Sequence, residues 1–253
     1  YGQKTDVGRT REVNEDYLDA RVYAPHAGPV LGSFIVADGV GGQEHGEVAS
    51  RLAAETIWTQ VRERIWEPEM EGRAILSEEM QEIIADAVRV ANQAVYALRA
   101  ERESGMGTTV TVALLRDNLG VIANVGDSRT YLWSAEGLRR LTVDHSVVEA
   151  LVAKGEITRE QVYTHPQRNL IYRSLGDRPG VEVDTFIQEL KPGDRLVLCS
   201  DGLWEMVRDE GIADVLMAEA NPQLACERLV EHANIAGGED NISVIIVQVE
   251  EKD

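Results

Sequence analysis

The sequence predicts one α+β domain with a small inserted flap. Apolar, β-branched runs typical of buried strands lie toward both ends of the chain, and segments with helical periodicity lie between them. No low-complexity linker separates these segments. We therefore assign residues 1–253 to a single domain, with residues 144–176 as the flap.

The first half of the chain is expected to combine strands with two helices. Strands are predicted at 17–22, 30–37, 109–114, 119–124 and 130–133, and helices at 46–64 and from 77 to about 102. Residues 66–73 contain Pro68 and Gly72 and are predicted to be a connection. Asp117 and Asn118 are typical of a hairpin turn.

The second half begins with the flap, whose short helical segments are interrupted by polar breaks. Strands are predicted at 181–187, 195–200 and 242–249, and helices at about 210–220 and 222–235. The strand at 195–200 is apolar and is expected to be buried.

The net charge of −19 argues against a nucleic-acid surface and against contact with anionic membranes. No stretch is apolar enough to span a bilayer, and the N-terminus does not resemble a signal peptide. We expect a cytoplasmic protein, or the cytoplasmic domain of a longer one, since the chain starts at Tyr1 without a methionine. No long exposed apolar stripe is evident, so a monomer is expected.

The two cysteines, Cys199 and Cys226, have neither metal-site spacing nor a disulfide pattern. They are interpreted as reduced core residues. A phosphatase with a thiolate nucleophile needs an arginine in the loop after its cysteine, and the matching positions hold Glu205 and His232. That chemistry is therefore excluded.

Asp38 directly follows the predicted strand at 30–37, and the glycines Gly39, Gly41 and Gly42 come next. A dinucleotide fingerprint needs glycines at the first, third and sixth positions, and the sixth is Glu44. An aspartate beside exposed backbone carbonyls suits a hard cation, but an ordinary Asp-Gly turn is the other interpretation.

Three more aspartates lie at junctions between apolar strands and glycine-containing loops: Asp127, Asp201 and Asp240. The pair Asp201-Gly202 repeats the arrangement at Asp38-Gly39, and two such pairs favour a shared role over two unrelated turns. Converging carboxylates repel one another unless cations lie among them, and ligand sets made only of oxygen select magnesium or manganese.

Two such cations lie about 3.5–4 Å apart in known sites and share a bridging carboxylate, for which Asp38 is the candidate. Water held between them is acidified to hydroxide and can attack phosphorus in line. Arg9 or Arg11 could grip the phosphate, while Glu15 or Asp16 could hold metal-bound water. A solvated loop with local ion pairs is the other interpretation of these residues.

Seven short motifs occur in order along almost the whole chain. They occupy residues 11–16, 36–42, 107–109, 124–129, 144–146, 200–204 and 240–243. With these motifs the chain resembles the metal-dependent serine/threonine phosphatases of the PPM family, the protein phosphatase 2C type, in the form found in bacteria.

The resemblance implies a four-layer α-β-β-α sandwich with two mainly antiparallel sheets and the flap beside the active-site cleft. It implies a signalling enzyme that hydrolyses phosphoserine and phosphothreonine monoesters by attack of a metal-bridging hydroxide on phosphorus. Its cofactors would be two Mn²⁺ or Mg²⁺ ions. Its partners would be phosphorylated proteins, such as a serine/threonine kinase or the substrates of that kinase.

The resemblance also implies a role for each matching residue. Asp38, Asp201 and Asp240 would hold the first metal ion. Asp38 and the carbonyl of Gly39 would hold the second.

Further roles carry over at the edge of this site. Asp16, and more weakly Glu15, would act through water, and Asp127 with Asp201 would form a third, weaker metal site. Arg11 matches the arginine that grips the phosphate, whereas Arg9 does not.

The chain departs from the family pattern where a proton donor to the leaving group is proposed. Val40 and Gln43 stand where many members carry a histidine, and a histidine follows at His45. The proton donor is therefore left open between water held by a metal ion and solvent. A phosphoprotein-binding module and a two-metal nuclease remain as alternatives, although the intact acidic set argues against the first and the negative charge against the second.

Overall fold

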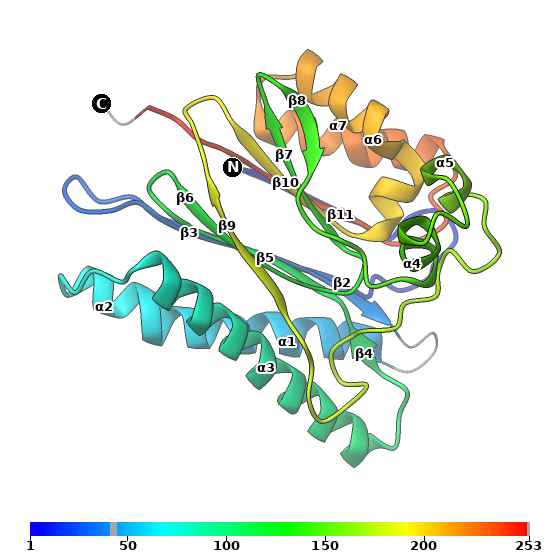
Figure 1. Ribbon diagram of the computed structural model, residues 1–253, viewed down its shortest axis with the longest axis horizontal. Helices are drawn as coiled ribbons and strands as arrows, with labels where there is room; N and C mark the ends of the chain where they lie inside the picture. The colour runs from blue at the N-terminus through cyan, green and yellow to red at the C-terminus, as the bar shows by residue number, and fades with distance from the viewer. Residues whose placement is uncertain (41–44, 252–253) are drawn as a thin grey trace.

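The protein is described by a computed structural model that covers residues 1–40 and 45–251. Figure 1 shows four layers, in which two helical layers enclose two β-sheets that pack face to face. All strand pairs within the sheets are antiparallel. The α-β-β-α sandwich expected from the sequence is confirmed.

Each sheet combines segments from distant parts of the chain. In spatial order the first sheet contains β2 (Asp16–Tyr23), β3 (Leu31–Val40), β5 (Val110–Arg116), β6 (Leu119–Val125) and β9 (Asp184–Glu189), with β4 (Gly107–Thr108) beside β3. The second contains β1 (Gly2–Asp6), β11 (Ile242–Gln248), β10 (Arg195–Cys199), β7 (Arg129–Ser134) and β8 (Gly137–Arg140).

The helices form the two outer layers and part of the flap. The first layer holds α1 (Gly46–Val61), a π-helical turn (Arg62–Trp66), α2 (Glu67–Met70) and α3 (Ser77–Arg102). The second holds α6 (Asp201–Ala218) and α7 (Pro222–Ile235), and the flap holds α4 (Val147–Ala153) and α5 (Arg159–Val162). No helix within the described residues is long and apolar enough to cross a membrane.

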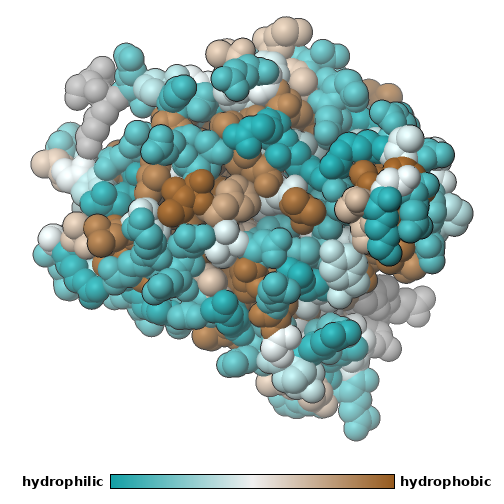
Figure 2. All heavy atoms as spheres, viewed as in Figure 1, coloured by the Kyte–Doolittle hydropathy of each residue, from teal (hydrophilic) through white to brown (hydrophobic). Residues whose placement is uncertain are grey.

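Three apolar clusters hold the layers together. One lies between α1, α3 and the first sheet, one between α6, α7 and the second sheet, and one between the two sheets. Strand β3 is buried along nearly its whole length because both of its faces are covered, which explains its unbroken apolar run. Figure 2 shows mostly hydrophilic side chains on one face, with hydrophobic patches scattered between them.

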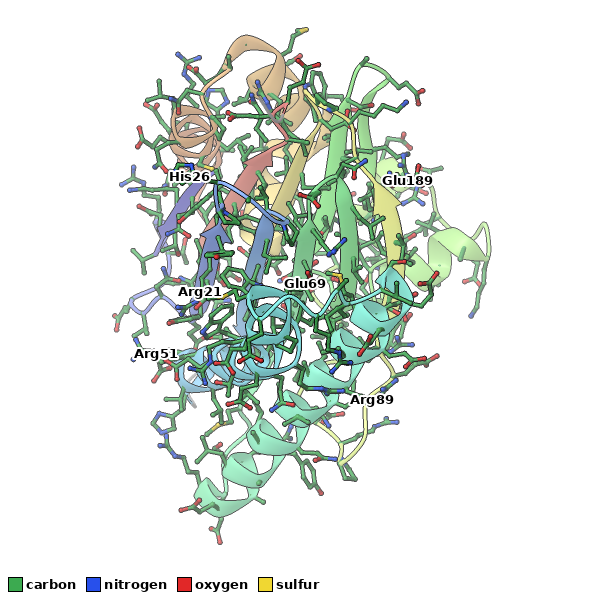
Figure 3. All side chains as sticks on the ribbon, turned by 90° about the vertical axis from the view of Figure 1, so that its left-hand side faces the viewer. Arg21, His26, Arg51, Glu69, Arg89 and Glu189 are labelled. Atoms are coloured by element: carbon green, nitrogen blue, oxygen red, sulfur yellow. The ribbon has the colours of Figure 1, made fainter. Side chains whose placement is uncertain are left out.

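Helix α1 is fixed to the first sheet by two cations stacked on aromatic rings. The guanidinium of Arg21 lies 4.4 Å from the ring centre of Trp58, and that of Arg51 lies 5.5 Å from the ring centre of Tyr17. Figure 3 shows Arg21 and Arg51 on the side of the molecule where α1 meets the sheet. Both contacts join α1 to β2.

Several elements differ from the prediction. The edge strands β1 and β8 were not predicted, because their sequences lack an apolar run and only one side of each strand is paired. Residues 67–70 are helical instead of being a connection. Helix α6 begins at Asp201, and the predicted start near residue 210 follows a kink at Arg208, where φ is 59° and ψ is 168°.

Candidate active site

Asp16 and Asp38 face each other across two neighbouring strands. They are Cα partners in the antiparallel pair of β2 and β3, where β2 begins and β3 ends. Asp16 is 8% exposed. The alternative interpretation of Asp38 as an idle turn residue is therefore wrong, because Asp38 lies within a paired strand next to a second buried carboxylate.

The Gly-Thr-Thr motif of residues 107–109 holds the backbone of Asp38. The carbonyl oxygen of Asp38 accepts hydrogen bonds from the Thr109 amide at 2.8 Å and from the Thr108 hydroxyl at 2.9 Å. At Gly39, an added Cβ would lie 2.5 Å from the backbone of Gly46 and 2.6 Å from the carbonyl oxygen of Glu15. Only glycine fits there, so β3 and α1 can approach closely.

Asp201 opens α6 directly after Ser200, and Ser200 links it to Asp16. The Ser200 hydroxyl donates to Asp16 Oδ2 at 2.7 Å and accepts from the Ser243 amide at 3.0 Å. This fixed hydroxyl orients the Asp16 carboxylate. The functional role of Ser200 was not predicted, and its position before the Asp-Gly pair was the one available signal.

Asp240 lies in the loop before β11 and pairs with the N-terminal loop. Its Oδ2 accepts from Arg11 Nη2 at 2.6 Å, and its Oδ1 accepts from the Asn241 amide at 2.8 Å. The Asn241 side chain donates to the carbonyl oxygens of Val7 and Val13, both at 3.0 Å. Asn241 thus fixes the loop that carries Arg11, a role that was not predicted from the sequence.

Asp127 follows a turn at Gly126, where φ is 106°. The Gly126 amide donates to Nδ1 of His145 at 3.0 Å, and the indole Nε1 of Trp204 donates to the Asp127 carbonyl oxygen at 3.0 Å. Ser128 bonds to Thr109 through their hydroxyls at 2.7 Å, which ties this turn to the motif that holds Asp38.

Glu15 has structural contacts beyond the expected water-mediated role. Its Oε1 accepts from the Gly46 amide at 3.2 Å, at the N-terminus of α1, and its carbonyl oxygen accepts from the Ser50 hydroxyl at 2.6 Å. A carboxylate is favourable at a helix N-terminus. Glu15 therefore anchors α1 next to the carboxylate cluster.

The aspartates share one buried electrostatic environment. Burial raises the pKa of Asp38 well above its usual range, and the carboxylates of Asp201 and Asp16 raise it further. Burial raises the pKa of Asp201 too, followed by the charges of Asp127 and Asp240. The pKa of Asp16 rises to about 6 and that of Asp127 to about 7, chiefly through burial. The structure thus brings together five of the predicted residues.

These residues suit hard cations. Within the described ranges, no three His, Cys, Asp or Glu side chains form a group that could hold an ion as they stand. Carboxylates that repel one another spread apart, and a bound cation removes the repulsion between them. Asp16 Oδ1 is buried and has no hydrogen-bond partner among residues 1–40 and 45–251, which costs about 1–3 kcal/mol unless a polar ligand is supplied. An all-oxygen donor set therefore fits Mg²⁺ or Mn²⁺ and water carried by them.

The departures from the family pattern lie near the end of β3. Val40 is its last residue, while Gln43 lies outside the described residues. His45 precedes α1 with φ of 68° and a side chain that is 54% exposed. Among the described residues, no hydrogen bond or ion pair connects His45 with these aspartates.

Comparisons with known proteins agree with this geometry. A family model described as "Protein phosphatase 2C" matches residues 8–232. The chain belongs to the protein phosphatase 2C family. The predicted enzyme class, a serine/threonine protein phosphatase, is confirmed by this membership and by the relatives.

The similarity extends over nearly the full chain. Serine/threonine phosphatase stp of Listeria welshimeri is 39% identical over 249 residues, covering 97% of this chain and 94% of the relative. The serine/threonine phosphatase structure of S. agalactiae has 32% identity and a TM-score of 0.85, with 98% of both chains covered. The catalytic domain of PstP in complex with two manganese ions has 32% identity and a TM-score of 0.80, covering 99% of this chain and 97% of that one.

Proposed function

We propose that this phosphatase hydrolyses phosphoserine and phosphothreonine monoesters in proteins with the help of two Mn²⁺ or Mg²⁺ ions. The observation that carries the proposal is a cluster of buried and half-buried aspartates beside an arginine, in which neighbouring carboxylates raise the pKa values of Asp38 and Asp201. A relative of the same fold is known in complex with two manganese ions. Phosphorylated proteins, such as a serine/threonine kinase or its substrates, are the proposed partners.

We assign the metal ligands by position. Asp38, Asp201 and Asp240 would hold one ion, and Asp38 with the Gly39 carbonyl would hold the other, so that Asp38 bridges the two. Asp16 would act through water, because Ser200 binds its Oδ2 and no described residue donates a hydrogen bond to its Oδ1. When bound, such ions lower the pKa of water toward neutrality and offset the charge of phosphoryl oxygens.

The remaining assignments are weaker ligands at the edge of the site. Asp127 and Asp201 would form a third, weaker metal site, and the charge of Asp127 raises the pKa of Asp201. Glu15 would contribute through water only with the oxygen that does not bind the Gly46 amide.

Arg11 would hold the substrate phosphate. Its side chain is 41% exposed and lies at the mouth of the carboxylate cluster, paired with Asp240. A guanidinium can bind two phosphate oxygens at once. When Arg11 binds the phosphate, Asp240 becomes free to bind a cation. Val40 provides no proton, so the departing serine or threonine oxygen would take its proton from water.

The test is phosphate release from a phosphothreonine peptide in manganese, in magnesium and in excess EDTA. Release should require the metal and be abolished in Asp201→Asn. Asp86→Asn, on the exposed face of α3, is a control with the same charge change and should keep its activity. Folded protein that releases no phosphate with either metal would refute the proposal.

A further inference from the structure

A cavity of about 570 Å³ lies between the flap and α6. Glu205 and Glu239 contribute carboxylates to its lining, and the flap contributes Arg168. Glu205 lies one helical turn after Asp201, and Glu239 directly precedes Asp240. The segments that carry two of the proposed metal ligands therefore also form this cavity, so a peptide with its phosphate at the metal site can reach it.

Arg168 forms an ion pair with each of the two carboxylates. Its Nε lies 3.4 Å from Glu205 Oε2, and its Nη2 lies 3.1 Å from Glu239 Oε2. Its side chain is 32% exposed. The pair with Glu239, whose side chain is 59% exposed, contributes little because water and salt compete with it. The Glu205 side chain is only 12% exposed, so Arg168 can leave it only when another cation takes its place.

The rest of the lining suits the stem of a long basic side chain. Tyr163 and Met206 present an aromatic ring and a thioether to the cavity. Lysine and arginine lay their aliphatic stems along such surfaces while their charged ends reach polar groups. The guanidinium of Arg208 already lies 4.7 Å from the ring centre of Tyr163, which shows that this ring accepts a cation on its face.

The surrounding charge favours a cationic ligand as well. The chain carries a net charge of −19, and the aspartate cluster lies next to the cavity. Arg168 is held by both Glu205 and Glu239, so its displacement leaves two carboxylates to receive one incoming cation.

We propose that this cavity binds a lysine or arginine side chain that lies near the phosphorylated residue of the substrate, in place of Arg168. This inference rests on the proposed function, because it names the class of protein substrate that the same site prefers. Arg168 then acts as an internal competitor that the correct substrate displaces.

The experiment compares kcat/KM for phosphothreonine peptides that are identical except for flanking arginine, alanine or glutamate. The wild-type protein should prefer the arginine peptide over the alanine peptide by about two- to five-fold, as expected for a partly exposed ion pair. Each variant is compared with itself across the peptides, so a general loss of activity does not affect the ratio.

Two variants of opposite effect test the cavity directly. Glu239→Lys should reverse the preference, so that the glutamate peptide becomes better than the arginine peptide. Arg168→Ala should increase the preference for the arginine peptide, because the competitor is gone. Glu82→Lys, exposed on α3, makes the same change in net charge as Glu239→Lys and should keep the wild-type ratio.

The outcomes separate this inference from the proposed function. Equal kcat/KM for all peptides in the wild-type protein, or an unchanged preference in Glu239→Lys, would overturn the cavity as a subsite while leaving the phosphatase activity in place. No phosphate release from any peptide would overturn the proposed function itself.

Discussion

Arg11 and Asp240 form an ion pair of 2.6 Å between Nη2 and Oδ2, although 229 positions separate them in the chain. The pair joins the N-terminal loop to the loop before β11. The pair also connects Arg11, the proposed phosphate-binding residue, with Asp240, a proposed metal ligand. A metal ion at Asp240 and a phosphate at Arg11 would therefore each release the other partner, which couples the two binding events.

Arg11→Ala is expected to lower kcat/KM for a phosphopeptide by about a hundred-fold, the loss typical of one well-placed charged donor. Manganese affinity should not fall, because the variant removes a competitor for Asp240. Steady-state kinetics and calorimetry measure the two effects. Arg9→Ala is the matched control, since the described contact of Arg9 is through its backbone amide, which donates to the Gly238 carbonyl oxygen at 2.7 Å. Full activity in Arg11→Ala would contradict the assignment.

Ser200→Ala should weaken manganese binding by about ten- to a hundred-fold, the usual effect of losing an outer hydrogen bond to a metal site. The reason is that Asp16 loses the hydroxyl that orients its carboxylate at 2.7 Å. Calorimetric titration with Mn²⁺ measures the change. Ser33→Ala is the control, because the buried Ser33 hydroxyl has no hydrogen-bond partner within the described part of the chain and its removal should leave metal binding unaltered. Equal affinities in both variants would refute the orienting role.

The aspartates could be predicted from the sequence because each stands where an apolar strand meets a glycine-containing loop. In the structure Asp16 is the strand partner of Asp38, and the charges of Asp201 and Asp16 raise the pKa of Asp38. The supporting groups could not be predicted in this way. Ser200 and Asn241 act on residues that lie far away in the chain, and nothing local marks such contacts.

The fold elements that were not predicted also depend on contacts with distant parts of the chain. Strand β1 has little apolar character and exists because it pairs with β11 at the other end of the chain. The kink at Arg208 interrupts α6 at a position without glycine or proline, and tertiary contacts hold a conformation that local preference disfavours. Local pattern therefore predicts buried elements better than edges and kinks.

The ring of His145 is expected to make the stability of the protein depend on pH. Burial lowers its pKa, the charge of Arg173 lowers it further, and Asp184 opposes the change. Neutral Nδ1 accepts from the Gly126 amide, and protonation would remove that acceptor. Because the folded pKa lies below the unfolded value of 6.5, this stabilisation is complete above pH 6.5 and is lost as the pH falls through the folded pKa.

Urea unfolding in EDTA at about pH 7.5 and about pH 5 tests this dependence, since the window spans the ordinary titration of histidine. His145→Asn should be less stable than the wild-type protein at the higher pH, and the difference should shrink at the lower pH. His26→Asn, at an exposed position, should show no such change. A constant difference between His145→Asn and the wild-type protein at both pH values would contradict the role of the neutral ring.

The buried pair of Arg129 and Asp144 should be the most sensitive ionic contact. Asp144 is 1% exposed and lies 2.6 Å from Arg129 Nη2, while the guanidinium lies 3.5 Å from the ring centre of Trp204. Asp144→Ala would leave the buried Arg129 with the longer ion pair to Asp209, at 3.8 Å, at a cost of about 3 kcal/mol in the free energy of unfolding. Asp86→Ala, which breaks an exposed pair with Arg89, should cost less than about 1 kcal/mol. Similar losses in the two variants would refute this ranking.

In the proposed function, the aspartates form one site for two metal ions that Asp38 bridges. Calorimetric titration of Mn²⁺ into the wild-type protein and into Asp38→Asn, with phosphate release measured on the same samples, tests it most directly. The wild-type protein should bind at least two ions, and Asp38→Asn should lose affinity for both together with its activity. Wild-type stoichiometry, affinity and turnover in Asp38→Asn would contradict the claim.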